Sequence, residues 1–430
     1  MPLLDSEVKH PLGHRNQVSG GPEESPLTDT SRESKLAPKP TDIEETGLSK
    51  WLLADLLCKH LIEAGVLDLG ELAQRIALPG KVVEELLHFL REEGRVELRS
   101  RRDNSPLLRY GLTERGRYGA IDALQKDGYV GPAPVTLEHY RELVGIQSAR
   151  LFRYSREAIK SIFADTVIRS ELIDRLGPAI HSGRAIFIYG DPGTGKSYMS
   201  RRMKRALGAP VILPHAIAVG ESVIRYFDPS IHAPVDHPDD TSNTGLHQGF
   251  DARLVRCERP LVVAGGELTM DLLELQFDRN TRQYGAPLQL IANCGLFVID
   301  DLGRQQISVE TLLNRWIMPM EERRDQLALN NGRHFSVPFD LALIFATNLE
   351  PTQLADDAFL RRIGYKIRFK PASRGEYEAI WKQVCELLGI KFDNQLFGYV
   401  VDELHAVQDT PLMQCYPRDL LQLASEHCAY

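Results

Sequence analysis

Residues 190–197 of this 430-residue chain read Gly-Asp-Pro-Gly-Thr-Gly-Lys-Ser. The run matches the pattern G-x-x-x-x-G-K-[ST], in which glycines let backbone amides curl around phosphate groups without Cβ clashes. Lys196 is expected to reach the β- and γ-phosphates of a nucleotide, and the Ser197 hydroxyl to bind Mg²⁺. The simpler alternative is a glycine-rich turn that binds no nucleotide. The candidate nucleotide contacts are all eight residues of the loop: Gly190, Asp191, Pro192, Gly193, Thr194, Gly195, Lys196 and Ser197.

Two adjacent carboxylates, Asp300 and Asp301, follow the apolar run LFVI. In open α/β sheets ligands bind at the carboxyl ends of the strands, so these side chains are expected near the phosphate loop. Asp300 would hold Mg²⁺ through water, and Asp301 would orient or deprotonate an attacking water. The simpler alternative is a pair of aspartates that caps a helix after a strand.

Asn348 follows Thr347 at the end of another apolar run, LALIF. A neutral amide there could hold the attacking water without competing for its proton. Taken alone, Asn348 would more often be a turn former. Its place after the other two motifs makes it a candidate sensor of the nucleotide.

The elements that must position these side chains are four apolar runs, AIFIYG, LVVAGG, LFVIDD and LALIFATN. They alternate with helical segments from about residue 136 onward. This alternation predicts a parallel α/β sheet whose two faces are both covered. After about residue 371 the chain is expected to be helical.

The first part of the chain has a different pattern. Residues 1–44 lack periodicity and predict a disordered arm, with order beginning near Thr46. Residues 45–127 predict three helices and then a β-hairpin, the order of a winged helix-turn-helix domain, with Trp51 on the buried face of the first helix. Residues 128–160, which begin with GYVGPAPV, are expected to form a linker and a lead-in helix.

Composition limits the class of protein. Hydrophobic residues make up 43% of the chain and charged residues 26%, as in globular proteins of several domains. With 51 basic and 59 acidic residues, the net charge of −8 argues against a general polyanion binder. The six cysteines have no zinc-site spacing and are expected to be free thiols. Without a signal-peptide pattern or a long apolar run, the sequence predicts a cytoplasmic protein with no membrane span.

The order of these motifs resembles that of AAA+ ATPases over about 160–430. The stretch GDPGTGKS is similar to Walker A, VIDD to Walker B and ATN to sensor 1. Residues 357–362, DAFLRR, resemble the arginine-finger segment, and PRD at 417–419 resembles the sensor-2 helix. The resemblance implies an AAA+ P-loop NTPase domain at 161–370, a helical lid at 371–430, and ATP and Mg²⁺ as cofactors. It further implies a homo-oligomeric, hexameric ring, in which Arg361 or Arg362 reaches the neighbour's nucleotide and Arg418 contacts the chain's own.

The whole chain is similar to a narrower bacterial group with an N-terminal winged-helix-like domain, described as predicted ATPases with chaperone activity associated with Flp pilus assembly. The stretches that carry this resemblance include GGELTMDLLEL, PLQLIANCGLFVIDDLGRQ, LLNRWIMPME and FLRRIGYKI. One departure is Asp301, where many AAA+ proteins carry Glu. Because Asp is one methylene shorter, hydrolysis could be slow.

The resemblance leaves the target of the ATPase open. A remodelled protein partner is the favoured interpretation. A DNA-associated regulator or loader is the first alternative, and a nucleotide-gated scaffold with slow turnover is the second. The third N-terminal helix is net acidic, which is unfavourable for a DNA groove, whereas the following hairpin carries five arginines at 95, 99, 101, 102 and 109.

The insert at about 226–258 holds His232, His237 and His247 and is expected to be a loop rather than a metal site. The segment QFDRNTRQYGAP, with Phe277 and Tyr284, could pack internally or face a pore or subunit interface.

Overall fold

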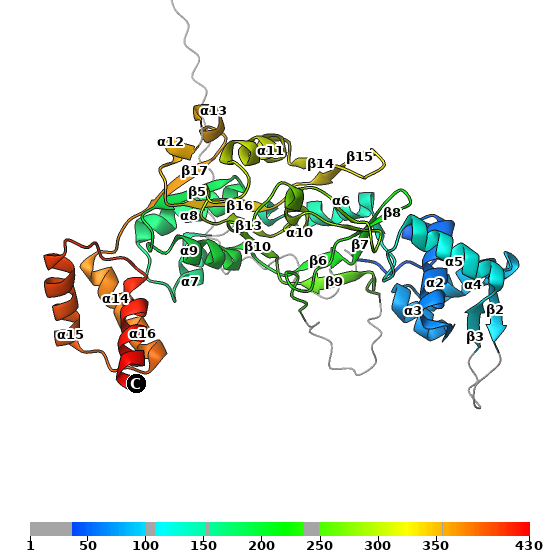
Figure 1. Ribbon diagram of the computed structural model, residues 1–430, viewed down its shortest axis with the longest axis horizontal. Coiled ribbons are helices and arrows are strands. Elements are labelled where there is room, and N and C mark those ends of the chain that lie inside the picture. Colours follow the sequence, from blue (N-terminus) through cyan, green and yellow to red (C-terminus); the bar gives the residue numbers. More distant parts are fainter. Residues whose placement is uncertain (1–36, 100–107, 152–154, 236–248, 355) are drawn as a thin grey trace, which may run out of the picture.

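The computed structural model describes residues 37–99, 108–151, 155–235, 249–354 and 356–430. The described chain is elongated (Figure 1). A small helical unit formed by the early residues lies at one end, the β-sheets lie in the middle, and the last helices lie at the other end.

The central element is a five-stranded sheet in which every neighbouring pair is parallel. Its strands, in order across the sheet, are β10 (Leu261–Ala264), β13 (Leu296–Ile299), β16 (Ala342–Thr347), β5 (Ile186–Gly190) and β17 (Tyr365–Phe369). The parallel sheet predicted from the four apolar runs is confirmed, and β17 completes it.

Helices cover both faces of this sheet, which explains why its strands are apolar at nearly every position. One face packs Ile186 and Ile188 against a helical layer, and the other packs Phe187 and Phe345 near Trp316. The first layer consists of α7 (Arg156–Ile162), α8 (Ser170–Ser182), α9 (Lys196–Arg202) and the 3₁₀ segment η3 (Met203–Leu207). The second is formed by α6 (Leu137–Ile146), α10 (Leu288–Ile291), α11 (Val309–Glu322), α12 (Pro351–Leu354) and α13 (Asp357–Leu360).

A second five-stranded sheet, of mixed direction, lies between the central sheet and the N-terminal unit (Figure 1). Its order is β11 (Gln276–Asp278), β12 (Gln283–Gly285), β8 (Ser222–Arg225), β7 (Ala216–Val219) and β4 (Val135–Thr136). Two antiparallel pairs complete the strands: β6 (Val211–Pro214) with β9 (Leu254–Cys257), and β14 (Arg324–Ala328) with β15 (His334–Pro338). None of these elements was expected from the sequence pattern.

The N-terminal unit combines helices with a small antiparallel sheet of order β1-β3-β2. Its elements are η1 (Glu44–Thr46), α2 (Lys50–Ala64), β1 (Val66–Asp68), α3 (Leu69–Ile76), α4 (Gly80–Glu92), β2 (Val96–Arg99), β3 (Arg109–Leu112) and α5 (Glu114–Lys126). Trp51 was expected on the buried face of α2, but its side chain is half exposed and meets the Phe89 ring edge-on at 4.9 Å. The turn expected within the predicted hairpin falls in residues 100–107, which lie outside the described residues.

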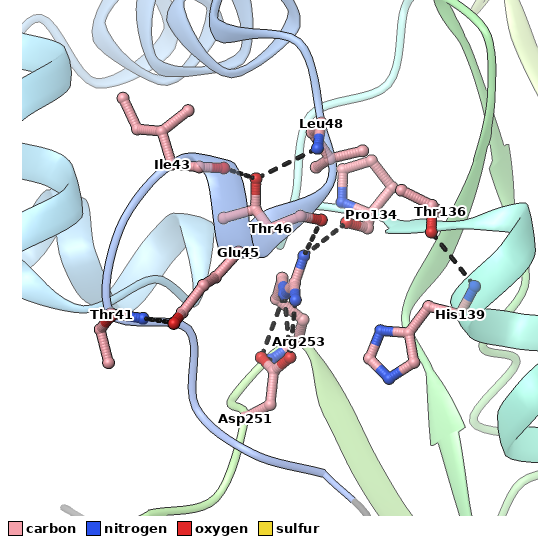
Figure 2. A network of polar contacts seen from close by, with 10 residues as sticks. All are labelled: Thr41, Ile43, Glu45, Thr46, Leu48, Pro134, Thr136, His139, Asp251 and Arg253. Atoms are coloured by element: carbon pink, nitrogen blue, oxygen red, sulfur yellow. Dashed lines mark hydrogen bonds and ion pairs between the residues drawn. The ribbon is translucent and has the colours of Figure 1, made fainter.

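Hydrogen bonds from a buried arginine join the N-terminal unit to the sheets (Figure 2). The Asp251 carboxylate accepts from Nε and Nη2 of Arg253, and both side chains are almost fully buried. Arg253 Nη1 donates to the carbonyl oxygens of Thr46 and Pro134, both at 3.3 Å. One guanidinium therefore ties together the start of the N-terminal unit, the segment before β4 and the loop before β9.

Two predictions about the N-terminal boundaries need correction. Residues 37–44, expected to belong to the disordered arm, are part of the folded structure: Ala37 is fully buried and its carbonyl oxygen accepts from Asp251 N. The rest of the predicted arm, 1–36, lies outside the described residues. The segment 128–135 is not a free linker: Tyr129 and Ala133 are buried in one core with β7 and β8, and β4 pairs with β7.

The last part of the chain is helical, as expected. It contains α14 (Arg374–Leu388), α15 (Asn394–Gly398), a π-helical segment η5 (Tyr399–His405) and α16 (Tyr416–Ala429). These helices have their own aromatic core around Tyr377, Trp381 and Phe397. A bidentate ion pair from Arg169 to Glu376, at 2.7 and 2.8 Å, fastens them to the segment before α8.

Candidate active site

The loop 190–197 connects β5 to α9 and depends on glycine at two close approaches. Gly190 has φ 135°, and a Cβ there would lie 2.1 Å from the Phe369 carbonyl oxygen of the neighbouring strand. Gly193 has φ 82°, and its Cβ would lie 2.7 Å from Cys415 Sγ. The loop therefore packs directly against β17 on one side and against the residues before α16 on the other.

Lys196 is buried at the start of α9, and its ammonium has three acceptors. Nζ donates to the Gly190 and Asp191 carbonyl oxygens at 2.9 and 2.8 Å, and to Asn348 Oδ1 at 2.6 Å. Burial lowers the pKa of Lys196, while the nearby carboxylates, Asp301 first among them, act in the opposite direction. The lysine thus connects the phosphate loop to the end of β16.

The carboxylates after β13 meet the same loop. Ser197 Oγ donates to Asp300 Oδ1 at 2.8 Å, and Asn348 Nδ2 donates to Asp301 Oδ1 at 3.2 Å. The hydrogen bonds therefore link Lys196 to Asn348 and Asn348 to Asp301, next to the hydrogen bond between Ser197 and Asp300. Five candidate residues from three loops come together because β5, β13 and β16 are adjacent parallel strands whose carboxyl ends lie at one edge.

Gln305 is a residue of this site that the sequence analysis missed. Its Nε2 donates to the carbonyl oxygens of Asp300 and Asp301 at 2.9 and 3.3 Å, and its Oε1 accepts from Gly303 N at 2.8 Å. A glutamine in a polar loop gives no recognisable signal, because its role depends on where the backbone turns.

The predicted arginines lie elsewhere. Arg361, after α13, is exposed and lines a shallow pocket of about 520 Å³ that also includes Tyr189 and Lys366. Arg362 forms an ion pair with Glu321, and Arg418 is exposed in the first turn of α16. The contact that the structure gives between the C-terminal helices and the phosphate loop comes instead from the backbone amide of Cys415, which donates to the Gly193 carbonyl oxygen at 3.1 Å.

The donor set at Ser197 and Asp300 fits Mg²⁺, which prefers oxygen ligands and retains several waters. In the described part of the chain, no group of three His, Cys, Asp or Glu side chains is placed to hold a metal ion alone. A magnesium ion here would therefore depend on phosphate oxygens and water in addition to these two side chains.

A basic cavity of about 790 Å³ opens beside Ser197. Five of its lining residues are basic and Glu258 is the acidic one. Besides Ser197 and Glu258, the lining consists of Tyr198, Arg201, Arg202, Lys204, Arg205, Gly208, Pro210 and Arg259. Ion pairs with Asp165 engage Arg202 and Arg205, and Lys204 pairs with Glu258. The positive lining favours anionic ligands near the phosphate loop.

Three other expectations can be compared with the structure. The arginine-rich hairpin is largely engaged internally: Arg95 pairs with Asp55, Arg99 with Glu97, and Arg109 donates to Val66 O, while residues 101 and 102 lie outside the described residues. Phe277 and Tyr284 pack against each other, with ring centroids 4.7 Å apart. All six cysteines are free.

His232 of the insert is buried and structural. Its ring nitrogens bond to the Asp228 amide and the Ile291 carbonyl oxygen, both at 3.0 Å. His237 and His247 lie outside the described residues, so the expected loop that contains them stays a prediction.

Comparisons with known proteins match part of the chain. Residues 373–430, from the beginning of the C-terminal helices onward, match the family described as "Domain of unknown function (DUF8689)". A search of curated proteins finds no match. No helix in the described residues has the length and apolar character needed to cross a lipid bilayer.

Two solved structures give distant likenesses. NtrX from Brucella abortus aligns with 64% of this chain at 11% identity and a TM-score of 0.35; the aligned part spans 52% of the NtrX chain. A model of the complex between subunits BchI and BchD of magnesium chelatase aligns with 65% of this chain and 74% of its own, at 15% identity and a TM-score of 0.32. Similarity this low carries no functional argument, which therefore rests on the site itself.

Proposed function

We propose that this chain is an AAA+ ATPase that binds ATP with Mg²⁺ on the loop 190–197 and hydrolyses it to remodel or assemble a protein partner. The observation that supports the proposal best is the continuous set of contacts Lys196–Asn348–Asp301 beside Ser197–Asp300. In the proposal these contacts would bring a cation for the phosphates, oxygen ligands for a metal ion, and a carboxylate with an amide to one sheet edge.

Each residue of the site has a separate role in the proposed hydrolysis of ATP. Lys196 would contact the β- and γ-phosphates, and Ser197 and Asp300 would hold Mg²⁺, which would supply positive charge against the phosphates. Asp301 orients a water and accepts its proton as the water oxygen bonds to the γ-phosphorus. The bond from that phosphorus to the bridging oxygen breaks, and ADP and phosphate leave. Asn348 holds the same water through its amide.

The proposal extends to the organisation of the chain. We propose a winged helix at 45–127, an AAA+ nucleotide domain at 161–370 and a lid at 371–430, in which Arg418 contacts the nucleotide. Arg361 or Arg362 would complete the site of the next subunit in a homo-oligomeric ring. The link to chaperone activity and pilus assembly is suggested by the sequence resemblance alone.

A protein partner is favoured over DNA by the surface of the N-terminal unit. The exposed side of α4 carries Glu84, Glu85 and Glu92. The arginines of the hairpin that the structure describes are largely used in internal contacts, as set out above. Phosphate contacts dominate DNA affinity, so this surface offers little to a duplex.

Two variants with matched controls test the ATPase. Lys196→Ala should weaken ATP binding by roughly tenfold to a hundredfold, because a charged hydrogen bond of about 1.5–3 kcal/mol is lost. Asp301→Asn should retain ATP binding but lower kcat by roughly a hundredfold or more, since the water loses its general base. The controls are Lys160→Ala, at an exposed residue of α7, and Asp409→Asn, which shares the positive φ of Asp301 but lies between η5 and α16.

Calorimetric affinity and steady-state turnover should be measured with and without duplex DNA. Equal ATP affinity of Lys196→Ala and the wild type would show that the phosphate site is elsewhere. Stimulation by DNA would favour the DNA-associated ATPase, and tight binding without turnover would favour the nucleotide-gated scaffold.

A further inference from the structure

The turn after β13 has an unusual backbone that needs support. Asp301 has φ 51° and Gly303 has φ 107°, so two residues within three are left-handed. For a residue other than glycine this conformation is uncommon and persists where the surroundings enforce it. The turn carries the carboxylate that the proposed mechanism needs at a fixed position.

Neighbouring strands hold the two ends of this turn. Asp300 N donates to Ala264 O of β10 at 2.8 Å, and Leu302 N donates to Ala346 O of β16 at 2.8 Å. These bonds fix the backbone on either side of Asp301. They leave the carbonyl oxygens of Asp300 and Asp301 to other partners, and Arg304 N donates to the Asp301 oxygen at 3.0 Å.

Gln305 adds a side-chain donor to both carbonyl oxygens and links the two peptide planes to each other. Its amide nitrogen donates to both carbonyl oxygens, and its amide oxygen accepts from Gly303 N. A primary amide is suited to this task because it has two donor hydrogens and an acceptor on one rigid plane. Among ordinary side chains of this length, Glu offers only acceptors when ionised, and Met offers no donor.

We propose that Gln305 is a positioning residue for ATP hydrolysis, which fixes the direction of the Asp301 carboxylate by holding the peptide planes of the turn. The inference rests on the proposed function. It predicts that Gln305 affects the chemical step and leaves ATP binding unchanged, because Gln305 contacts the carboxylate turn, whereas binding depends on the loop around Lys196.

Gln305→Glu gives a test with a pH signature. At neutral pH the new carboxylate would face two carbonyl oxygens that it cannot bond, so kcat should fall by about tenfold to a hundredfold, as expected for a misplaced catalytic group. KM for ATP should stay within about twofold of the wild type. The two carbonyl oxygens favour the protonated acid, which can donate one bond, so the ratio of variant to wild-type kcat should rise as pH falls from about 8 to 6.

Two further variants separate positioning from other effects. Gln305→Met removes all three bonds and cannot regain a donor, so its kcat should be low with a ratio to wild type that does not change with pH. Gln306→Glu adds the same charge one residue away, where the described structure shows no side-chain hydrogen bond, and should retain wild-type kcat. Thermal unfolding of each variant, with affinity for a non-hydrolysable ATP analogue, checks that fold and binding are intact.

The outcomes distinguish this inference from the function on which it rests. A wild-type chain that binds but does not hydrolyse ATP would overturn both. Wild-type hydrolysis with Gln305→Glu and Gln305→Met unchanged in kcat would overturn the role of Gln305 alone. A loss of kcat in Gln305→Glu that does not recover at low pH, or a rise in KM without loss of kcat, would also overturn it.

Discussion

Asn348 uses both ends of its amide, one on a cation and one on an anion. Its oxygen accepts from Lys196 at 2.6 Å, and its nitrogen donates to Asp301 at 3.2 Å. A phosphate that draws Lys196 away would release the oxygen while leaving the nitrogen bonded. At the scale of a single residue, Asn348 is thus placed to relay occupancy of the phosphate loop to the proposed catalytic carboxylate.

Asn348→Asp should weaken ATP binding. The new carboxylate would form an ion pair with Lys196 and hold it away from the phosphates, while the donor to Asp301 is lost. Since a charged hydrogen bond contributes about 1.5–3 kcal/mol, we expect roughly a tenfold or greater rise in Kd by calorimetry. Asn331→Asp, at the exposed tip of the β14–β15 hairpin, is the control. An unchanged Kd would mean that Lys196 does not have to leave Asn348 to bind phosphate.

At the scale of elements, the insert between β8 and β9 depends on a neutral histidine. His232 Nδ1 accepts from Asp228 N, so Nε2 carries the proton that it donates to Ile291 O. Burial lowers the pKa of His232, and the same cause lowers the pKa of His60, His139 and His215. Protonation of His232 would break its bond from Asp228.

Stability should therefore decrease in acid. The unfolded chain takes up protons near the ordinary histidine pKa of about 6.5, whereas the folded chain resists until lower pH, so the free energy of unfolding falls as pH drops below that value. Urea denaturation at several pH values measures the slope. His232→Gln should make the slope shallower and His88→Gln, on the exposed side of α4, should not. Equal slopes for all three proteins would remove His232 from the explanation.

Burial explains which elements the sequence predicts. The strands β5, β13 and β16 are covered on both faces, so each is a continuous apolar run, and the motif at its end can be assigned to the same sheet edge. The hairpin strand β14 alternates, but one of its inward residues is Asp325, buried in an ion pair with Arg315. The sequence of β14 therefore lacks the regular alternation of apolar and polar residues that would identify a half-buried strand.

The parts of the site that escaped prediction depend on the path of the backbone. Gln305 acts because the turn at Asp301 brings two carbonyl oxygens to its amide, and no spacing rule encodes that turn. The segment 128–135 has the glycine and proline content of a linker, yet Tyr129 and Ala133 are buried against β7 and β8. Composition describes the local chain, whereas this burial depends on residues more than eighty positions away.

At the scale of the whole molecule, mixing two defective chains tests the proposed shared site. Lys196→Ala lacks the phosphate-binding cation, and Arg361→Ala/Arg362→Ala lacks both candidate fingers. Each protein alone should be nearly inactive, but a mixed interface would pair an intact loop with intact fingers and restore some turnover. Steady-state ATPase activity of the mixture measures this. No recovery on mixing, or full turnover of a dilute monomer shown by light scattering, would contradict it.

The single variants can identify the finger. Arg362 already forms an ion pair with Glu321, whereas the described part of the chain shows no ion pair to Arg361. Arg361→Ala should therefore lower kcat more than Arg362→Ala does. The reverse order would assign the finger to Arg362 and require its ion pair to open.

The N-terminal unit is joined to the sheets at several points around Arg253. Core packing, the pairing of β4 with β7 and the bonds to Thr46 and Pro134 bind that unit to the sheets (Figure 2). The C-terminal helices are held by the ion pair from Arg169, by the backbone bond to Gly193 and by the bond from Gln383 Nε2 to Asp165 O. We expect a nucleotide cycle to rotate those helices against everything else. A partner bound to the N-terminal units of two neighbouring subunits would then be displaced only when whole subunits change their relative orientation. The motion that acts on the partner would therefore occur between subunits and not within one subunit.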